Sequence, residues 1–174
     1  MRCFIGINFN EEAMRKMNVL AYSLAKNGIK GNFVRSNNVH LTLLFLGDLD
    51  DYDLEKVEQI MDTISFDSFS VRLTKLTKLR DIIVLEAEKT KELLALQKEI
   101  SCKIKEECPN LIKANVNQEY YPHVTLAREN NDEIFKDVDI VSDVDSIYLF
   151  SSEMYNGGVL YKKQYERKSN NGKK

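Results

Sequence analysis

The chain has 174 residues, of which 43% are hydrophobic and 30% are charged. This composition is typical of a folded globular protein and excludes a wholly disordered chain. Seven Gly and two Pro exclude collagen-like or proline-rich low-complexity architecture. The net charge is −2, and residues 161–174 hold six basic residues and one acidic residue, so the rest of the chain is acidic. Such a body does not coat nucleic acid through bulk charge, whereas a substrate with one or two phosphates needs only a local basic pocket.

The sequence predicts a protein of a reducing, cytoplasmic compartment. No run of residues approaches the roughly 18 apolar positions of a transmembrane helix. The apolar stretch at residues 1–7 is too short for a signal peptide and lacks a small-residue cleavage site. The three cysteines, Cys3, Cys102 and Cys108, are odd in number and lack Cys-x-x-Cys spacing. This argues against both a disulfide framework and a structural zinc site.

The first expected element is a strand at residues 2–9. Asn10 is a suitable helix N-cap, and apolar residues then recur at helical spacing until Asn27-Gly28, which predicts a helix between them. The same periodicity predicts helices at about 51–64 and at 90–107. The remaining strand-like runs are 39–46, 69–76, 82–87, 123–127, 146–150 and 159–161, with a turn at Asn156-Gly157-Gly158.

The mixed order of these elements predicts an α+β fold with largely antiparallel sheets rather than a regular βαβ alternation. We expect one domain over residues 1–168, since no linker separates two units. Residues 169–174 have nothing apolar to bury, and we expect a disordered tail there. The acidic residues near the start of the second helix are interpreted as capping and first-turn residues rather than as a metal site: Asp48, Asp50, Asp51 and Asp53.

The chain has only two histidines, and both stand in the same local pattern. His40 opens His-Leu-Thr-Leu, and His123 opens His-Val-Thr-Leu, each inside a strand-like run. Because side chains alternate along a strand, each histidine shares a face with the threonine two positions on, while the residues between them point into a core. Two such strands side by side would form a cleft with two imidazoles and two hydroxyls. The motif positions are His40, Leu41, Thr42, Leu43, His123, Val124, Thr125 and Leu126.

These groups suit the opening of a phosphodiester. Histidine has an ordinary pKa of about 6.5, so near neutral pH one imidazole can act as base on the incoming oxygen and the other as acid on the leaving oxygen. Hydroxyls and a guanidinium can hold the phosphate, and the reaction requires no metal or other cofactor. A single strand histidine is more often structural, but recurrence of the pattern at every histidine of the chain favours a catalytic pair.

The paired motifs resemble those of the two-histidine (2H) phosphoesterases, and within them the bacterial and archaeal RNA 2′,3′-cyclic phosphodiesterase branch, long labelled 2′-5′ RNA ligase. The opening strand at 1–7 is similar to that branch, as are the blocks from Asn32 to Gly47 and from Pro122 to Arg128. The resemblance covers most of residues 1–165. Phe33 stands where the branch often has Trp, so the position stays aromatic.

The resemblance implies a bilobal, LigT-like fold of two pseudo-symmetric antiparallel sheet lobes, with outer helices, around a central cleft. It also implies hydrolysis of a 2′,3′-cyclic phosphate at an RNA end to a 2′-phosphate. In that reaction His40 would be the proton donor to the leaving 3′ oxygen, and His123 would be the proton acceptor that activates water. Thr42 and Thr125 would bind the phosphate oxygens, and Arg128 would supply positive charge.

Three basic or aromatic positions near the motifs are further candidates. Arg128 lies five positions after His123, so strict alternation puts it on the opposite face and the strand must turn it inward. Tyr121 shares a face with His123 and can border the cleft or stack on a base, although core packing is the commoner role of an aromatic residue. Arg35 precedes the first motif and can approach the phosphate, with a solvated turn residue as the alternative.

Other functions stay open at this point. A 2H enzyme could act on a 2′,5′-oligonucleotide or a cyclic nucleotide, or it could join RNA by 2′-5′ ligation. A nucleotide- or RNA-binding module could keep the cleft without turnover, although intact His and Thr in both motifs argue against it. The motifs could also be accidental in a structural protein. We expect a cytoplasmic RNA-end-processing hydrolase that acts as a monomer, without a metal, and contacts no membrane.

Overall fold

The structure is a computed structural model that describes residues 1–111 and 119–171. Within these residues the α-helices are α1 (Glu11–Lys26), α2 (Asp51–Asp62) and α3 (Lys91–Glu107). The strands are β1 (Arg2–Ile7), β2 (Asn32–Phe33), β3 (Leu41–Asp48), β4 (Phe69–Leu79), β5 (Ile82–Ala87), β6 (His123–Arg128), β7 (Lys136–Val144), β8 (Ser146–Tyr155) and β9 (Gly158–Lys168). Two short 3₁₀ turns are η1 (Ser36–Asn38) and η2 (Pro109–Leu111).

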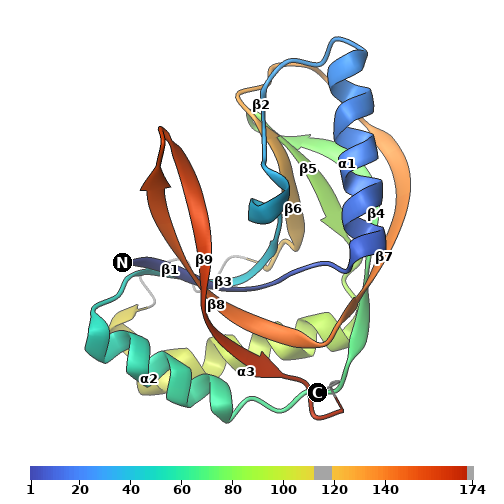
Figure 1. Ribbon diagram of the computed structural model, residues 1–174. Coiled ribbons are helices and arrows are strands. Elements are labelled where there is room, and N and C mark those ends of the chain that lie inside the picture. The colour runs from blue at the N-terminus through green and yellow to red at the C-terminus, as the bar shows by residue number, and fades with distance from the viewer. Residues whose placement is uncertain (112–118, 172–174) are drawn as a thin grey trace.

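The strands form one antiparallel sheet in the order β7-β4-β5-β6-β3-β1-β8-β9, with β2 paired to β6. The sheet curls into two lobes that meet where β6 lies beside β3 (Figure 1). Counted outward from this junction, the strand order is β6-β5-β4-β7 in one lobe, which also holds β2 beside β6, and β3-β1-β8-β9 in the other. The predicted α+β fold with two pseudo-symmetric antiparallel lobes is therefore confirmed.

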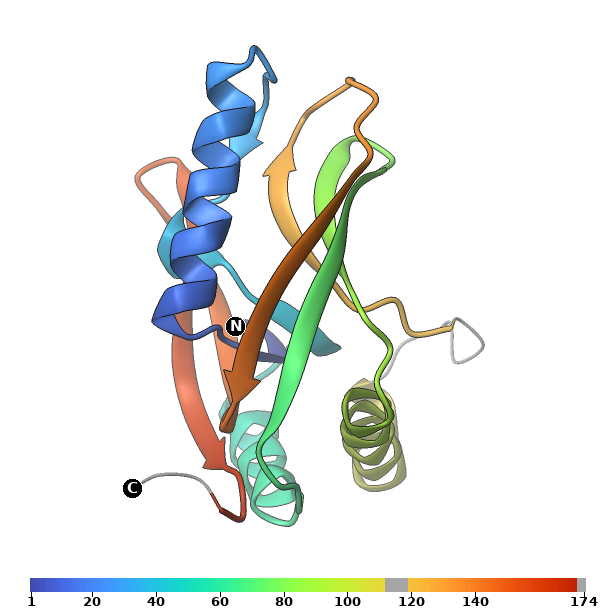
Figure 2. The ribbon, with the colours of Figure 1, turned by 90° about the vertical axis from the view of Figure 1, so that its right-hand side faces the viewer.

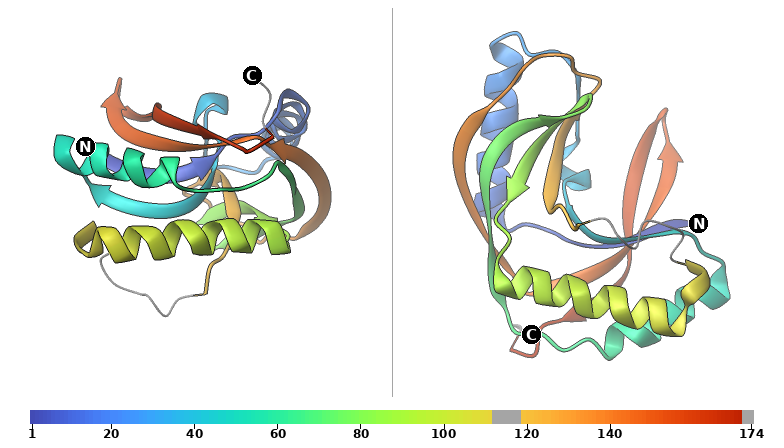
Figure 3. Two further views of the ribbon diagram at one scale, coloured as in Figure 1. Left: turned by 90° about the horizontal axis from the view of Figure 1, so that it is seen from below. Right: turned by 180° about the vertical axis from the view of Figure 1, so that it is seen from behind.

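The helices cover different lobes. α1 packs along β7, and its long axis follows that lobe (Figure 2). α2 and α3 contact one another beneath the other lobe, where α3 packs against β3 (Figure 3). The buried face of α3 repeats at helical spacing: Leu93, Leu96, Ile100 and Ile104. Among the described residues no helix is both long and apolar enough to span a lipid bilayer.

Side-chain caps begin the helices at the expected residues. The Asn10 side chain accepts a hydrogen bond of 2.9 Å from the backbone N–H of Ala13 at the start of α1. Asp50 accepts from the N–H of Asp53, and the Asp53 carboxylate accepts from the N–H of Asp50, which closes a capping box at α2. The assignment of these two acids to capping is confirmed.

Some strands extend beyond the sequence prediction, and two were not predicted. β8 and β9 continue to their shared turn, where Asn156 and Gly157 have φ of 48° and 77°, as a tight hairpin turn requires. β7 was missed because acidic residues interrupt its apolar alternation, and it pairs on one side only, with β4. β2 was missed because two residues are too few to show a period.

The chain after β9 is held by hydrogen bonds as far as Asn171, although its composition predicts a free tail from Ser169. The backbone N–H of Ser169 donates to the carbonyl of Asp145, and that of Asn170 donates to the carbonyl of Phe66. The donor–acceptor distance is 2.8 Å in each bond. Ser169 is buried. Polar residues order here through the backbone rather than through apolar burial, which composition does not reveal. Residues 172–174 lie outside the described residues.

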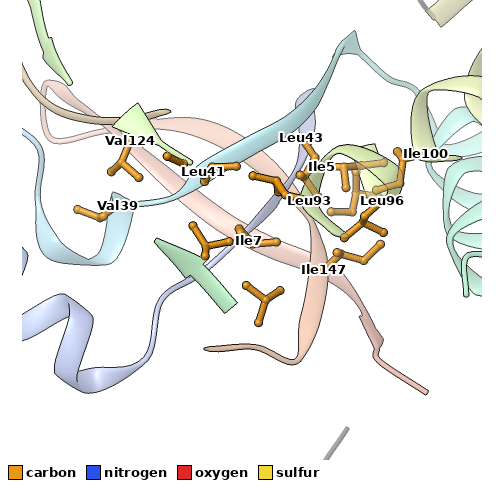
Figure 4. Packing of buried hydrophobic residues seen from close by; sticks show 14 of the residues in the cluster. Ile5, Ile7, Val39, Leu41, Leu43, Leu93, Leu96, Ile100, Val124 and Ile147 are labelled. Carbon is orange, nitrogen blue, oxygen red and sulfur yellow. The ribbon is translucent and has the colours of Figure 1, made fainter. Parts of the chain in front are cut away.

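A single hydrophobic core runs through the molecule, and the strand junction is part of it. Leu41 of β3 and Val124 of β6 are both fully buried. They lie close to Val39, and the cluster continues through β1 and β8 to the buried face of α3 (Figure 4). The pair that joins the two lobes therefore also links their apolar interiors.

We expect Leu41→Ala to lower the free energy of unfolding by about 2–5 kcal/mol, because it removes fully buried methyl groups at the junction and leaves a cavity. Urea unfolding at neutral pH measures the change. The matched control is Leu94→Ala on α3, where the side chain is 37% exposed and we expect a loss below about 1 kcal/mol. Equal losses in the two variants would contradict this account of the junction.

Candidate active site

The cleft between the lobes has a volume of about 860 Å³. The residues that line it include His40, Thr42, His123, Thr125 and Arg128. The structure thus brings together both motif histidines, both motif threonines and the arginine that follows the second motif.

The pairing of β3 with β6 explains why the histidines meet. The register pairs Leu41 with Val124, and each of these residues directly follows its motif histidine. In antiparallel strands the residue before one member of a pair lies beside the residue after the other member. His40 therefore lies toward Thr125, and His123 lies toward Thr42. Since Leu41 and Val124 point into the core, all four polar side chains emerge on the cleft face.

A β-bulge turns Arg128 toward the cleft. Between the pairs Val84–Thr125 and Ile83–Ala127, β6 has one residue in excess, Leu126. An extra residue shifts the alternation of every later side chain by one position. Arg128 consequently lines the cleft with His123, as the family resemblance implied and as strict alternation would not allow.

The first motif strand carries a bulge at the equivalent position. Between the pairs Gly6–Thr42 and Ile5–Leu44, the residue in excess on β3 is Leu43, three positions after its histidine. Leu126 likewise lies three positions after His123. The residue five positions after the first histidine is Phe45, and it lines the cleft as Arg128 does on the other side. The pseudo-symmetry therefore extends from the motifs to the bulges.

Backbone carbonyls fix the tautomer of both histidines. Nδ1 of His40 lies 2.8 Å from the carbonyl oxygen of Asn38, and Nδ1 of His123 lies 2.8 Å from that of Tyr121. A carbonyl only accepts, so Nδ1 carries the proton in each ring and Nε2 has the free lone pair when the ring is neutral. Nε2 of His40 lies 3.1 Å from the Thr42 hydroxyl.

Aromatic rings enclose His40. The ring of Phe4 lies 4.5 Å from it between centroids, and Tyr161 meets it edge-on at 5.0 Å. Burial lowers the pKa of His40, the hydrogen bond to Asn38 opposes this, and the positive charge of Arg128 and of a protonated His123 lowers the pKa further. In the free protein His40 is thus a stronger acid than an exposed histidine.

Asn38 holds the loop that carries His40. This buried side chain donates to the carbonyl of Val159 over 2.7 Å and accepts from the N–H of Tyr161 over 3.2 Å. Its own backbone carbonyl accepts a hydrogen bond from the Nδ1–H of His40. One residue therefore links the imidazole to β9. Asn38 was not among the candidates from the sequence, and no spacing marks it, because its partners are distant in the chain.

The second histidine is supported by Tyr121. Its ring stacks on His123 with centroids 4.9 Å apart, and its hydroxyl donates to Glu86 over 2.8 Å. Burial and this bond raise the pKa of Tyr121, so it stays a donor. Tyr121 lines the cleft, which is one of the two positions that the sequence left open. Arg35, by contrast, is exposed beside Gly158 at the β8–β9 turn and is not among the described residues that line the cleft.

Tyr120 supports the first motif strand from the opposite lobe. Its hydroxyl donates to the carbonyl of Thr42 over 2.7 Å, and burial raises its pKa. This bond ties the segment before β6 to β3. The sequence alone gave Tyr120 no specific role, because the contact joins residues 78 positions apart.

The profile of the 2′-5′ RNA ligase superfamily matches residues 24–150. This is more than half of the chain, and the chain belongs to that superfamily. A similar protein is the RNA 2′,3′-cyclic phosphodiesterase of Thermotoga maritima, which is 27% identical over 184 residues that cover 95% of this chain and 94% of that protein.

Solved structures share the fold. The crystal structure of TT0787 from Thermus thermophilus superposes with a TM-score of 0.85 at 20% identity and covers all of both chains (100% each). The structure of E. coli LigT complexed with 3′-AMP has a TM-score of 0.82 at 20% identity and covers 97% of this chain and 98% of that chain. Apo LigT gives the same TM-score, 0.82, at 18% identity, covering 97% and 96% of the two chains.

Burial of His40 predicts a pH dependence of stability. Because its pKa is lowered by folding, the unfolded chain binds the proton more readily, so stability is lost as pH falls from about 6.5 through the folded pKa. We expect the free energy of unfolding to fall more steeply in the wild type than in His40→Gln between about pH 7.5 and about pH 5. Urea titrations at several pH values test this, and parallel curves would contradict it.

Proposed function

We propose that this chain hydrolyses 2′,3′-cyclic phosphate ends of RNA to 2′-phosphates, with His40 as proton donor and His123 as proton acceptor. One observation carries the proposal: two imidazoles with Nδ1 held by a carbonyl line one cleft together with Arg128. The named activity of the Thermotoga maritima relative and the 3′-AMP complex of E. coli LigT support a nucleotide substrate.

In the proposed reaction each imidazole carries out one proton transfer. Neutral His123 accepts one proton of a water molecule at Nε2, and the water oxygen attacks phosphorus. The bond between phosphorus and the 3′ oxygen breaks, and protonated His40 donates its Nε2 proton to that oxygen. The products are a 3′-hydroxyl and a 2′-phosphate. The two histidines therefore carry out both proton transfers. Exchange with solvent then returns each imidazole to its starting protonation state.

The remaining cleft residues stabilise the phosphate. The hydroxyls of Thr42 and Thr125 and the guanidinium of Arg128 donate to its oxygens as charge moves onto them. The low pKa of His40 makes it a strong acid toward the leaving oxygen, although fewer His40 side chains are charged in the free protein. A bound phosphodiester anion offsets this, because a nearby negative charge favours the imidazolium.

The direct test uses RNA with a 2′,3′-cyclic phosphate end and EDTA in the buffer. We expect hydrolysis to a 2′-phosphate. The product gains the mass of one water and becomes sensitive to a phosphomonoesterase, to which the cyclic phosphate is resistant. Complete loss in EDTA that one divalent ion restores would contradict a reaction run by the two imidazoles. Joining of RNA ends, or cleavage of a 2′,5′-linked oligonucleotide alone, would move the chain to a different reaction of its superfamily.

His40→Ala and His123→Ala should each lower kcat by about 10²–10⁴, the usual contribution of a general acid or base. The double variant should lose far less than the product of the single losses, because groups that act as a unit are not additive. Circular dichroism of each variant controls for folding. Full activity in both single variants would remove the histidines from the reaction.

A substrate with a p-nitrophenolate leaving group separates the two roles. This leaving group departs without a proton, so it makes a general acid dispensable. We expect such a phosphodiester to restore much of the rate of His40→Ala while His123→Ala stays impaired. Single-turnover rates with both substrates give the comparison. Rescue of His123→Ala instead would reverse the assignment of acid and base.

A further inference from the structure

We infer that the cleft continues past the histidines as a binding track for single-stranded RNA. In this track Phe45 stacks on the base of the terminal nucleotide, and Lys98 and Lys105 of α3 bind phosphates further upstream. The inference rests on the proposed function for the position of the terminal phosphate. It adds the residues that bind the part of the RNA strand beyond the terminal phosphate.

The cleft extends well beyond the catalytic groups. Besides the motif residues, its wall includes the α3 residues Gln97, Lys98, Ser101, Cys102 and Lys105. The Gln97 side chain donates to the carbonyl of Leu43 over 3.2 Å, which anchors this face of α3 to the bulge in β3. The helix edge and the first motif strand therefore form one continuous surface.

Phe45 has the position and exposure of a stacking platform. It lines the cleft and is 58% exposed, so much of its ring is open to a ligand in the cleft. The ring of Phe4 lies between it and the first histidine, with centroids 4.5 Å from His40 and 5.8 Å from Phe45. The Phe4 ring therefore separates a base stacked on Phe45 from the imidazole of His40. The guanidinium of Arg2 lies 5.9 Å from the Phe45 centroid and adds positive charge at this point.

The cleft is basic although the chain as a whole is acidic. Four of its described lining residues are cations, Arg2, Lys98, Lys105 and Arg128, and one is acidic, Glu119. The carboxylate of Glu119 is occupied by an ion pair with Lys89 at 2.8 Å. The positive charge is therefore available to an anionic ligand along the whole cleft.

The two lysines on α3 are spaced for successive phosphates rather than for one. Lys98 and Lys105 are seven residues apart, which places them on the same side of the helix about 10 Å apart along its axis. Both side chains are exposed, and neither is in an ion pair within the part of the chain that the structure describes. We assign these lysines to phosphates upstream of the terminal one, which a free mononucleotide lacks. Base stacking on Phe45 requires an unpaired base, so the strand is single.

The test compares an unstructured RNA that ends in a 2′,3′-cyclic phosphate with the cyclic mononucleotide of the same base. For Lys98→Gln/Lys105→Gln we expect the ratio of kcat/KM for RNA to kcat/KM for the mononucleotide to fall. We also expect weaker binding of the same RNA ending in a 2′-phosphate, measured by fluorescence anisotropy. The slope of log K against log salt concentration should be smaller in magnitude by about 1.4, that is, by about 0.7 for each lost phosphate contact.

Phe45→Ala should weaken binding of the same RNA by about 5- to 150-fold, because it removes the stacking surface, and Phe45→Tyr should retain the affinity.

Matched controls come from the outer surface. Phe135 is 71% exposed and has Lys75 over its ring at 5.8 Å, so Phe135→Ala removes a similar aromatic–cation pair away from the cleft. Lys16→Gln/Lys26→Gln removes two exposed lysines of α1. We expect both controls to behave as wild type.

The outcomes separate the two proposals. Equal kcat/KM for both substrates, or test variants that match the controls, would overturn the RNA track while leaving cyclic phosphate hydrolysis in place. Failure to hydrolyse either substrate, with RNA binding that still depends on Phe45 and the lysines, would overturn the proposed function and support the track.

Discussion

The contact between Leu41 and Val124 is the constraint on which the site depends. It is the residue pair in which β3 meets β6, and it joins the two lobes of the sheet. Both side chains are buried, so hydrophobic burial holds this register: a slip by one residue would turn the apolar side chains toward the cleft. Because a histidine precedes each member of the pair, the same contact brings the two imidazoles to one surface. The energy that holds the lobes together therefore also assembles the candidate catalytic pair.

The surroundings of the two histidines differ within this symmetry. His40 is enclosed by Phe4 and Tyr161, and burial lowers its pKa. His123 stacks on Tyr121, whose hydroxyl is bound to a carboxylate. The two imidazoles thus have equivalent backbone geometry and unequal surroundings, and differing surroundings of this kind are what suit like groups to opposite acid–base roles. The bulges add the same kind of asymmetry, since equivalent positions on the two strands present an arginine on one side and Phe45 on the other.

The cleft is basic although the chain as a whole is acidic. In an acidic chain a basic cleft concentrates positive charge at one site, and such a distribution does not suit coating of a nucleic acid through bulk charge. The cations that line the cleft come from β1, β6 and α3. No segment of the sequence is basic enough to reveal this patch, because folding assembles it from single residues.

The sequence by itself determined the helices, most strands, the motif residues and the class of chemistry. These depend on local periodicity, on capping at Asn10 and Asp50, and on a motif that recurs at both histidines. The tertiary structure alone decided that the motif strands are neighbours, that bulges turn Arg128 and Phe45 toward the cleft, and that Asn38 anchors the loop of His40. It also showed the backbone hydrogen bonds that hold Ser169 and Asn170, and the edge strand β7. These features arise from pairing between residues far apart in the chain, and a bulge reverses the alternation that the sequence alone would predict.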